Sequence, residues 1–154
     1  MCNLPVEVLD SEKVARVIIF PFHFHKKKLK YIHRAFRPSP GTDRISVIRL
    51  THMGADFCKS KGKELVGDGD DKKYTGLAVL IARQVRDIGA DVHDVPVDYC
   101  GHAEISYGIV VEPGEPLESA ASKRLTEMTQ SIFKIAVYHE DRDPAAPSWT
   151  GDPL

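Results

Sequence analysis

The stretch VARVIIFPF, from Val14 to Phe22, constrains the fold more than any other part of the sequence. Apolar residues, many of them β-branched, occupy both odd and even positions along it. This pattern is typical of a strand that is covered on both faces, because a strand with one wet face alternates between apolar and polar residues. Pro21 limits its paired length, since proline has no N–H for a ladder. We therefore expect a central strand here.

Two long helices are predicted from apolar periodicity. The clearer one runs from Tyr74 to Ala90, where Leu77, Ile81, Val85 and Ile88 recur at helical spacing and Gly89 supplies a stop. The second runs from Leu117 to about Tyr138 and carries a continuous apolar stripe, made by Leu117, Ala121, Leu125, Met128, Ile132 and Ala136.

Shorter elements fill the space between these segments. Alternation and β-branched content predict a strand over Arg44 to Leu50, and shorter extended segments over residues 91–97 and 103–111. Thr51 is a predicted N-cap for a helix that is weakened by two glycines and carries Met53, Phe57, Cys58 and Leu65.

The chain of 154 residues fits one domain. The order of elements predicts an α/β or α+β fold, in which three to four helices cover a mixed sheet of about four strands. Residues 1–12 form a lead-in, and the polar, proline-rich residues 140–154 form an irregular tail.

Charge is unevenly distributed along the sequence. Through Leu50 there are ten Lys and Arg against four Asp and Glu, a net of +6, and the remainder has eleven against eighteen, a net of −7, so the sum is −1. Such asymmetry predicts either a basic face that meets an anionic partner or two parts of one fold that attract each other.

The basic residues are densest in HFHKKKLKYIHRAFR, from His23 to Arg37. As a helix it would place Leu29, Ile32 and Phe36 on one face, and a strand or irregular structure is the alternative. Basic and aromatic residues alternate here as in sites that attract phosphates and stack bases. The predicted binding residues are Lys26, Lys27, Lys28, Lys30, Tyr31, His33, Arg34 and Arg37.

We therefore expect a small accessory or binding domain whose basic patch contacts nucleic acid, a phosphorylated ligand or an acidic protein surface. The alternative is a solvated basic face paired with the acidic second half of the chain, which a sequence pI near 6.6 favours.

His102 and Glu104 are the candidate catalytic residues. Their spacing matches the first half of a zinc deaminase motif, but no Pro-Cys-x-x-Cys follows, which excludes that site. In a strand the two side chains share one face, where they would bind a metal or transfer protons in a nuclease or phosphodiesterase type of hydrolase. The alternative is the wet face of an edge strand.

His23 and His25 have the spacing of two metal ligands on an extended segment. A divalent metal would need further ligands from other histidines or carboxylates, and the chain has no His-Glu-x-x-His motif to supply them. Metal binding therefore rests on residue types alone.

Trp149 is the only tryptophan and lies in the irregular tail. A large apolar side chain there either pins the tail to the domain or offers an anchor to a protein partner or a second copy of the chain. This second alternative would make the protein one subunit of a larger assembly.

Three observations favour a cytoplasmic location without a membrane anchor. The apolar runs are far shorter than the roughly 20 residues that span a bilayer. The N-terminal sequence lacks the pattern of a secretory signal. The three cysteines, Cys2, Cys58 and Cys100, are odd in number and widely spaced, so we expect free thiols and no disulfide.

Overall fold

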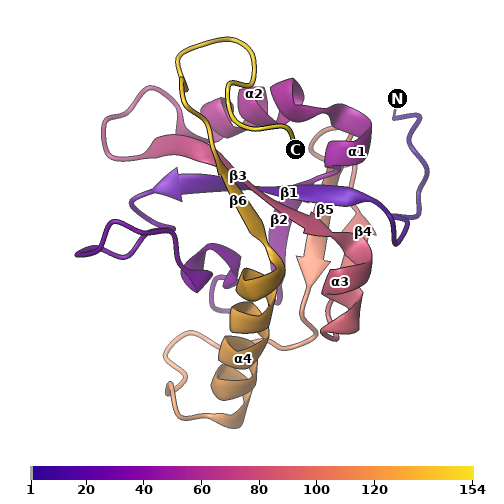
Figure 1. Ribbon diagram of the computed structural model, residues 1–154. Coiled ribbons are helices and arrows are strands. Elements are labelled where there is room, and N and C mark those ends of the chain that lie inside the picture. Colours follow the sequence, from indigo (N-terminus) through magenta and orange to yellow (C-terminus); the bar gives the residue numbers. More distant parts are fainter. Residues whose placement is uncertain (1) are drawn as a thin grey trace.

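The computed structural model describes residues 2–154. Its strands are β1 (Lys13–Phe20), β2 (Arg44–Ile48), β3 (Lys73–Ile81), β4 (Asp91–Asp94), β5 (His102–Ser106) and β6 (Val137–Glu140). Its helices are the 3-10 helix η1 (His33–Phe36) and the α-helices α1 (Leu50–Met53), α2 (Ala55–Val66), α3 (Ala82–Asp87) and α4 (Ala120–Ile135). The strands form one sheet in the order β4-β5-β2-β1-β3-β6 (Figure 1).

Helices cover both faces of the sheet. Figure 1 shows α1, α2 and the C-terminal segment on one side, and α3 and α4 on the other. The larger core lies under α4, whose Leu125, Met128 and Ile132 pack with the inward residues of β2 and β5. The smaller core lies under α2, where Cys58 meets Leu77 of β3. The chain is a single α+β domain, as the sequence predicted.

The predicted central strand is confirmed. β1 lies between β2 and β3, and Val14, Ala15 and Ile18 are fully buried on its two faces. The strand predicted from Arg44 is also present as β2.

The sheet is larger and more regular than expected. Every pairing between named strands is antiparallel, and the described residues form six strands where a mixed sheet of about four was predicted. The strands missed include β6, which is four residues long and follows directly on α4. Its first residues lie in the segment predicted as the end of a helix.

The clearest helix prediction, from Tyr74 to Ala90, was wrong over its first half. Residues up to Ile81 form β3, and the helix α3 begins only at Ala82. Leu77 and Ile81 have helical spacing, but positions four apart also share one face of a strand. β3 is buried on both faces, as Leu77 at 0% and Leu80 at 1% exposure show, and such a strand has no alternation to reveal it.

The helix prediction from His23 to Arg37 was also wrong, and the irregular alternative was right. Residues 24–31 double back on themselves, and only residues 33–36 form a single 3-10 turn. Phe36 is buried, whereas Leu29 is 62% exposed, so these two side chains do not share an apolar helix face.

The predicted N-cap at Thr51 is incorrect. Thr51 lies inside the short helix α1, and its Oγ1 accepts a hydrogen bond from the Lys13 N–H at 2.8 Å. Gly54, at φ 83°, separates α1 from α2. α4 begins later than predicted, where the Ser119 side chain accepts from the Ser122 N–H.

Cys2 and Cys100 form a disulfide, with Cα atoms 5.1 Å apart. The expectation of free thiols was therefore wrong for these two residues, and only Cys58 is free and buried. Spacing along the chain could not reveal the bond, because the folding of the lead-in is what brings Cys2 to the loop before β5. No helix within residues 2–154 has the length and apolar character needed to cross a membrane.

Candidate functional site

Residues 24–31 form a projecting hairpin, which we call the lysine hairpin (Figure 1, the indigo-purple loop beside β1). Phe24 and Tyr31 pair at its base, and the His25 N–H donates to the Lys30 carbonyl at 2.7 Å. The hairpin turns back within a few residues at its tip, where the Leu29 N–H donates to the His25 carbonyl at 2.9 Å and Leu29 itself has φ 50°. The segment is therefore a defined turn.

The His25 ring organises this turn. Its Nδ1 lies 3.2 Å from the Lys27 N–H and 3.1 Å from the Lys28 N–H, and accepts from both. These contacts hold the backbone at the tip while the lysine side chains face solvent. The exposed basic residues of the hairpin are Lys26, Lys27, Lys28 and Lys30.

The lysine hairpin has no acidic neighbour in sequence, because the chain carries no Asp or Glu between Glu12 and Asp43. Within residues 2–154, none of its four lysines takes part in an ion pair. The alternative that these lysines pair with the acidic second half of the chain therefore finds no support in the described contacts. Their charges are directed to solvent.

An aromatic cluster anchors the hairpin to the sheet. The Tyr31 ring stacks on Tyr138 of β6 at 5.0 Å between centroids and lies 4.9 Å from Phe133 of α4. Burial raises the pKa of Tyr31, and its hydroxyl has no hydrogen-bond partner in the described structure. Tyr31 is thus fixed at the foot of the hairpin, and its ring is not available for stacking on a nucleobase.

Of the other predicted members of the patch, one faces solvent and two make contacts within the protein. Arg34 is exposed beside the hairpin. His33 packs edge-on against Phe133 at 6.5 Å. Arg37 donates to Thr126 Oγ1 at 2.8 Å and to Ser122 Oγ at 3.2 Å, which fastens η1 to α4. The predicted patch therefore contains a solvent-facing part, made of the four lysines and Arg34, and a structural part, made of Tyr31, His33 and Arg37.

His102 and Glu104 lie on the same face of β5, as predicted for a strand. His102 is 4% exposed; its Nδ1 lies 2.9 Å from the Val95 carbonyl, and its ring is 5.1 Å from that of Tyr99. Glu104 accepts from Arg44 Nη1 at 3.2 Å. Each side chain is thus engaged with a different neighbour. Their catalytic role stays a prediction.

His23 and His25, the predicted metal pair, each accept backbone hydrogen bonds within their own segment. His23 Nδ1 accepts from the Ile19 N–H at 3.0 Å, and His25 Nδ1 accepts from the backbone N–H groups at the hairpin tip. Among residues 2–154, no group of three or more His, Cys, Asp or Glu side chains has the arrangement needed to hold a metal ion.

Trp149 pins the tail to the domain. Its backbone N–H donates to Asp56 Oδ1 of α2 at 2.7 Å, and its indole N–H donates to the Asp152 carbonyl at 2.8 Å. The ring packs against the smaller core. Of the two roles considered for this tryptophan, the described contacts are those of an intramolecular anchor.

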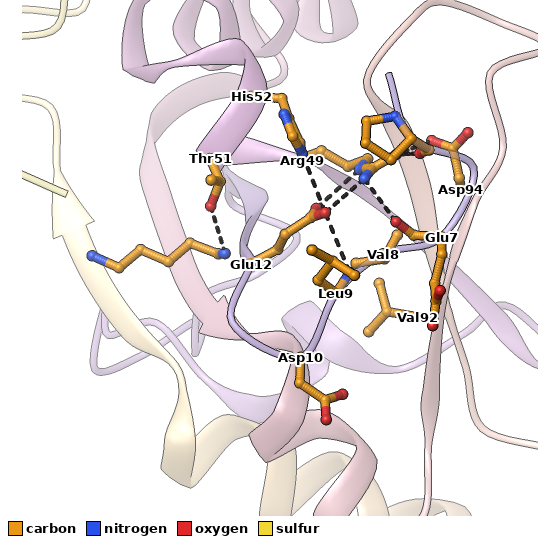
Figure 2. A network of polar contacts seen from close by, with 12 residues as sticks. Glu7, Val8, Leu9, Asp10, Glu12, Arg49, Thr51, His52, Val92 and Asp94 are labelled. Carbon is orange, nitrogen blue, oxygen red and sulfur yellow. Dashed lines mark hydrogen bonds and ion pairs between the residues drawn. The ribbon is translucent and has the colours of Figure 1, made fainter. Parts of the chain in front are cut away.

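Sequence reasoning missed two buried ion networks. In the first, the fully buried Arg49 donates to Glu12 and Asp94 and to backbone carbonyls of the lead-in (Figure 2). Burial alone would raise the pKa of Glu12. Hydrogen bonds from Arg49, the Leu9 N–H and His52 outweigh this effect and hold the pKa of Glu12 below its ordinary value. The network fixes the lead-in against the sheet.

The second network holds the tail. The buried Lys59 ammonium lies 3.1 Å from Asp141 Oδ2 and donates to the Asp143 and Ser148 carbonyls at 2.8 and 2.7 Å. Tyr74 also donates to Asp141, at 2.8 Å. In sequence, Arg49 and Lys59 resemble any other basic residue of a strand end or a helix, so only their position in the fold reveals these roles.

Comparison with protein-family models, with curated proteins and with solved structures finds no match for this chain.

Proposed function

We propose that this protein is an accessory domain that binds the phosphate backbone of a nucleic acid through the lysine hairpin. The observation that carries the proposal is the set of four exposed lysines, projected on one short turn without an acidic partner. Phosphate groups attract such charges in proportion to the number of contacts, and counterion release supplies the free energy.

The residue types favour backbone contact over base recognition. Lysine is a flexible point charge that meets a phosphate without a fixed orientation, whereas arginine forms planar, bidentate contacts with guanine or phosphate. Tyr31, which follows Lys30 in the chain, is packed against Phe133 and Tyr138 and is not available for stacking. We therefore expect binding with little dependence on base sequence.

The shape of the hairpin supports a polymer as the partner. The lysines lie on a projection and line no pocket together, so a small phosphorylated ligand would find no enclosing wall. A nucleic acid instead offers a row of phosphates along which a projecting turn can make several contacts. The exposed Arg34 extends the same basic surface.

The test is a titration followed by fluorescence anisotropy, with a labelled mixed-sequence DNA duplex and its single strand at a series of salt concentrations. The Lys27→Glu/Lys30→Glu variant should bind more weakly and should lower the slope of log K against log salt by about 2, because each phosphate contact contributes roughly 0.9 to it. The control is Lys63→Glu/Lys123→Glu, which makes the same change in net charge at exposed lysines of α2 and α4.

The proposal fails if the control pair weakens binding as much as the hairpin pair, since net charge alone would then explain the effect. It also fails if polyglutamate competes as well as DNA of equal charge, because the partner would then be an acidic protein surface. Wild-type protein that binds neither form of DNA would equally overturn it.

A further inference from the structure

β1 and β2 lie side by side in the sheet but pair only at Ala15 and Ile48. Beyond that point the two strands separate, and a cleft of about 240 Å³ occupies the space between them. This volume is smaller than the roughly 300–1,000 Å³ of a site for a drug-sized ligand. Only a small molecule would fit.

Arg16 bridges the gap between the separated strands. Its Nε donates to the Ala35 carbonyl at 3.0 Å and its Nη1 to the Ser46 carbonyl at 2.9 Å. Both partners are neutral, and among residues 2–154 no carboxylate forms an ion pair with this guanidinium. Burial lowers the pKa of Arg16 from its ordinary value. Arg16, which lines the cleft, thus carries a positive charge that no described carboxylate neutralises.

His23 is a second residue of the cleft lining with a hydrogen-bond donor that no described residue uses. The backbone N–H of His23 donates to the Ile19 carbonyl at 2.9 Å, and its ring Nδ1 accepts from the Ile19 N–H at 3.0 Å. An accepting Nδ1 places the proton of the neutral ring on Nε2, which has no partner within residues 2–154. Burial, together with the positive charges of Arg16 and Arg34, lowers the pKa of His23 to about 3.

The remaining walls are mostly apolar. Aliphatic residues of both strands line the cleft, together with Tyr99 and with Leu65 of α2, which is 60% exposed. No Asp or Glu lines the cleft, and its full lining is Ala15, Arg16, Val17, Ile19, His23, Ser46, Val47, Ile48, Leu65 and Tyr99.

We propose that this cleft binds a small planar organic monoanion, of the aryl carboxylate class, with its carboxylate on Arg16 and His23 and its ring between the apolar walls. A carboxylate matches the remaining donors of the guanidinium. Inorganic phosphate carries more charge and more hydration, which apolar walls do not replace. The inference is independent of the nucleic-acid proposal, since the hairpin lysines do not line the cleft.

The first experiment is a titration of ¹⁵N-labelled protein with benzoate, followed by two-dimensional NMR. Benzamide has the same ring without the charge, and acetate has the charge without the ring. We expect saturable shifts for the cleft residues with benzoate. Affinities should be at least about tenfold weaker for benzamide, which lacks the charge-assisted hydrogen bonds, and for acetate, which lacks the apolar ring that the walls would bury.

Leu65 offers a variant that leaves the fold intact, because its side chain is largely exposed. Leu65→Glu should weaken benzoate binding and Leu65→Lys should strengthen it, each by about threefold to fivefold, as for one charge acting across a few ångströms of water. Leu117→Glu is the matched control, since Leu117 is 80% exposed and lies outside the cleft.

Equal affinities for benzoate and benzamide would overturn the proposal, as would shifts that do not saturate or that fall outside the cleft. Unchanged benzoate affinity in both Leu65 variants would do so too. The Lys27→Glu/Lys30→Glu protein should bind benzoate like the wild type, so failure of the nucleic-acid proposal and failure of this one are separable.

Discussion

Arg49 and Glu12 form a two-point ion pair inside the protein. Arg49 Nη2 lies 2.7 Å from Glu12 Oε1 and Arg49 Nε lies 3.0 Å from Oε2, with side chains that are 0% and 3% exposed. Asp94 accepts from the same guanidinium at 2.9 Å. The pair joins the residue before β1 to the residue after β2, and so fixes the start of the chain at one end of the sheet.

Arg49→Met is expected to destabilise the domain by about 3–5 kcal/mol, because it leaves Glu12 and Asp94 buried without their counter-charge. Urea unfolding measures this loss. Arg44→Met is the control: Arg44 pairs with Glu104 at 3.2 Å, but its side chain is 52% exposed, so we expect less than about 1 kcal/mol. Similar losses in the two variants would contradict the special role of the Arg49 network.

The Cys2–Cys100 disulfide closes a loop with a sequence separation of 98. Reduction, or the Cys2→Ser/Cys100→Ser change, should lower the free energy of unfolding by up to about 4 kcal/mol, because the unfolded chain regains the entropy of a long loop. Thermal unfolding with and without reductant measures the shift.

A thiol count provides the control for this prediction. Cys58 is buried in the smaller core, and burial raises its pKa to about 12. The native oxidised protein should therefore expose no reactive thiol to an aromatic disulfide reagent, and denaturation should reveal one. Three reactive thiols after denaturation without reductant would show that the disulfide is absent.

How far the fold was predictable depends on how local each signal is. β1 was predicted correctly because it has apolar residues at both odd and even positions, which indicates burial on both faces. This signal can be recognised without knowing which strands pair with β1. β3 has the same property in the run LAVLIA, but Leu77, Ile81, Val85 and Ile88 extend a four-residue spacing across a strand and the following helix. The uninterrupted apolar run was the better signal.

The candidate site shows the same division. The exposure of the hairpin lysines follows from their charge. The packed position of Tyr31 does not follow from its residue type, because it depends on Tyr138 and Phe133, which come from the far end of the chain. Arg16 lies in the most apolar stretch of the sequence. That it bridges β1 and β2 through neutral carbonyl groups, without an acidic partner, is revealed only by the fold, in which these strands separate.

Gly62 allows α2 to lie close to the sheet. A Cβ at this position would be 2.7 Å from Tyr74 Cδ1 and 3.0 Å from Val17 Cγ1, and Tyr74 is held by its bond to Asp141. In an open helix, glycine to alanine stabilises by roughly 1 kcal/mol. Here we expect Gly62→Ala to destabilise by about 1–3 kcal/mol, because overpacking outweighs that gain.

Ser60→Ala is the matched control for Gly62→Ala, because Ser60 is exposed on the same helix. It should be neutral or slightly stabilising. Chemical unfolding of both variants gives the comparison, and a stabilised Gly62→Ala protein would show that α2 does not pack this closely on β1 and β3.

His23 should make the domain sensitive to mild acid. The pKa of His23 is lowered from 6.5 to about 3 in the folded protein by burial and by the nearby Arg16 and Arg34. Between these values the unfolded chain binds a proton that the folded chain does not, so stability is fully present above pH 6.5 and falls as the pH decreases toward 3. The expected slope is at most about 1.4 kcal/mol per pH unit.

His23→Asn separates this contribution from that of the acidic residues. The Asn Oδ1 can accept from the Ile19 N–H as Nδ1 does, but it does not titrate, so stability measured by urea unfolding should vary less between pH 6.5 and 4.5 than in the wild type. The lowered pKa values of Glu12 and Asp141 act below this window, since their ordinary values are 4.5 and 3.8. Equal pH dependence of the free energy of unfolding in the two proteins between pH 6.5 and 4.5 would mean that His23 is not held neutral. The assignment of its single ring proton to Nε2, beside the cleft, would then be wrong.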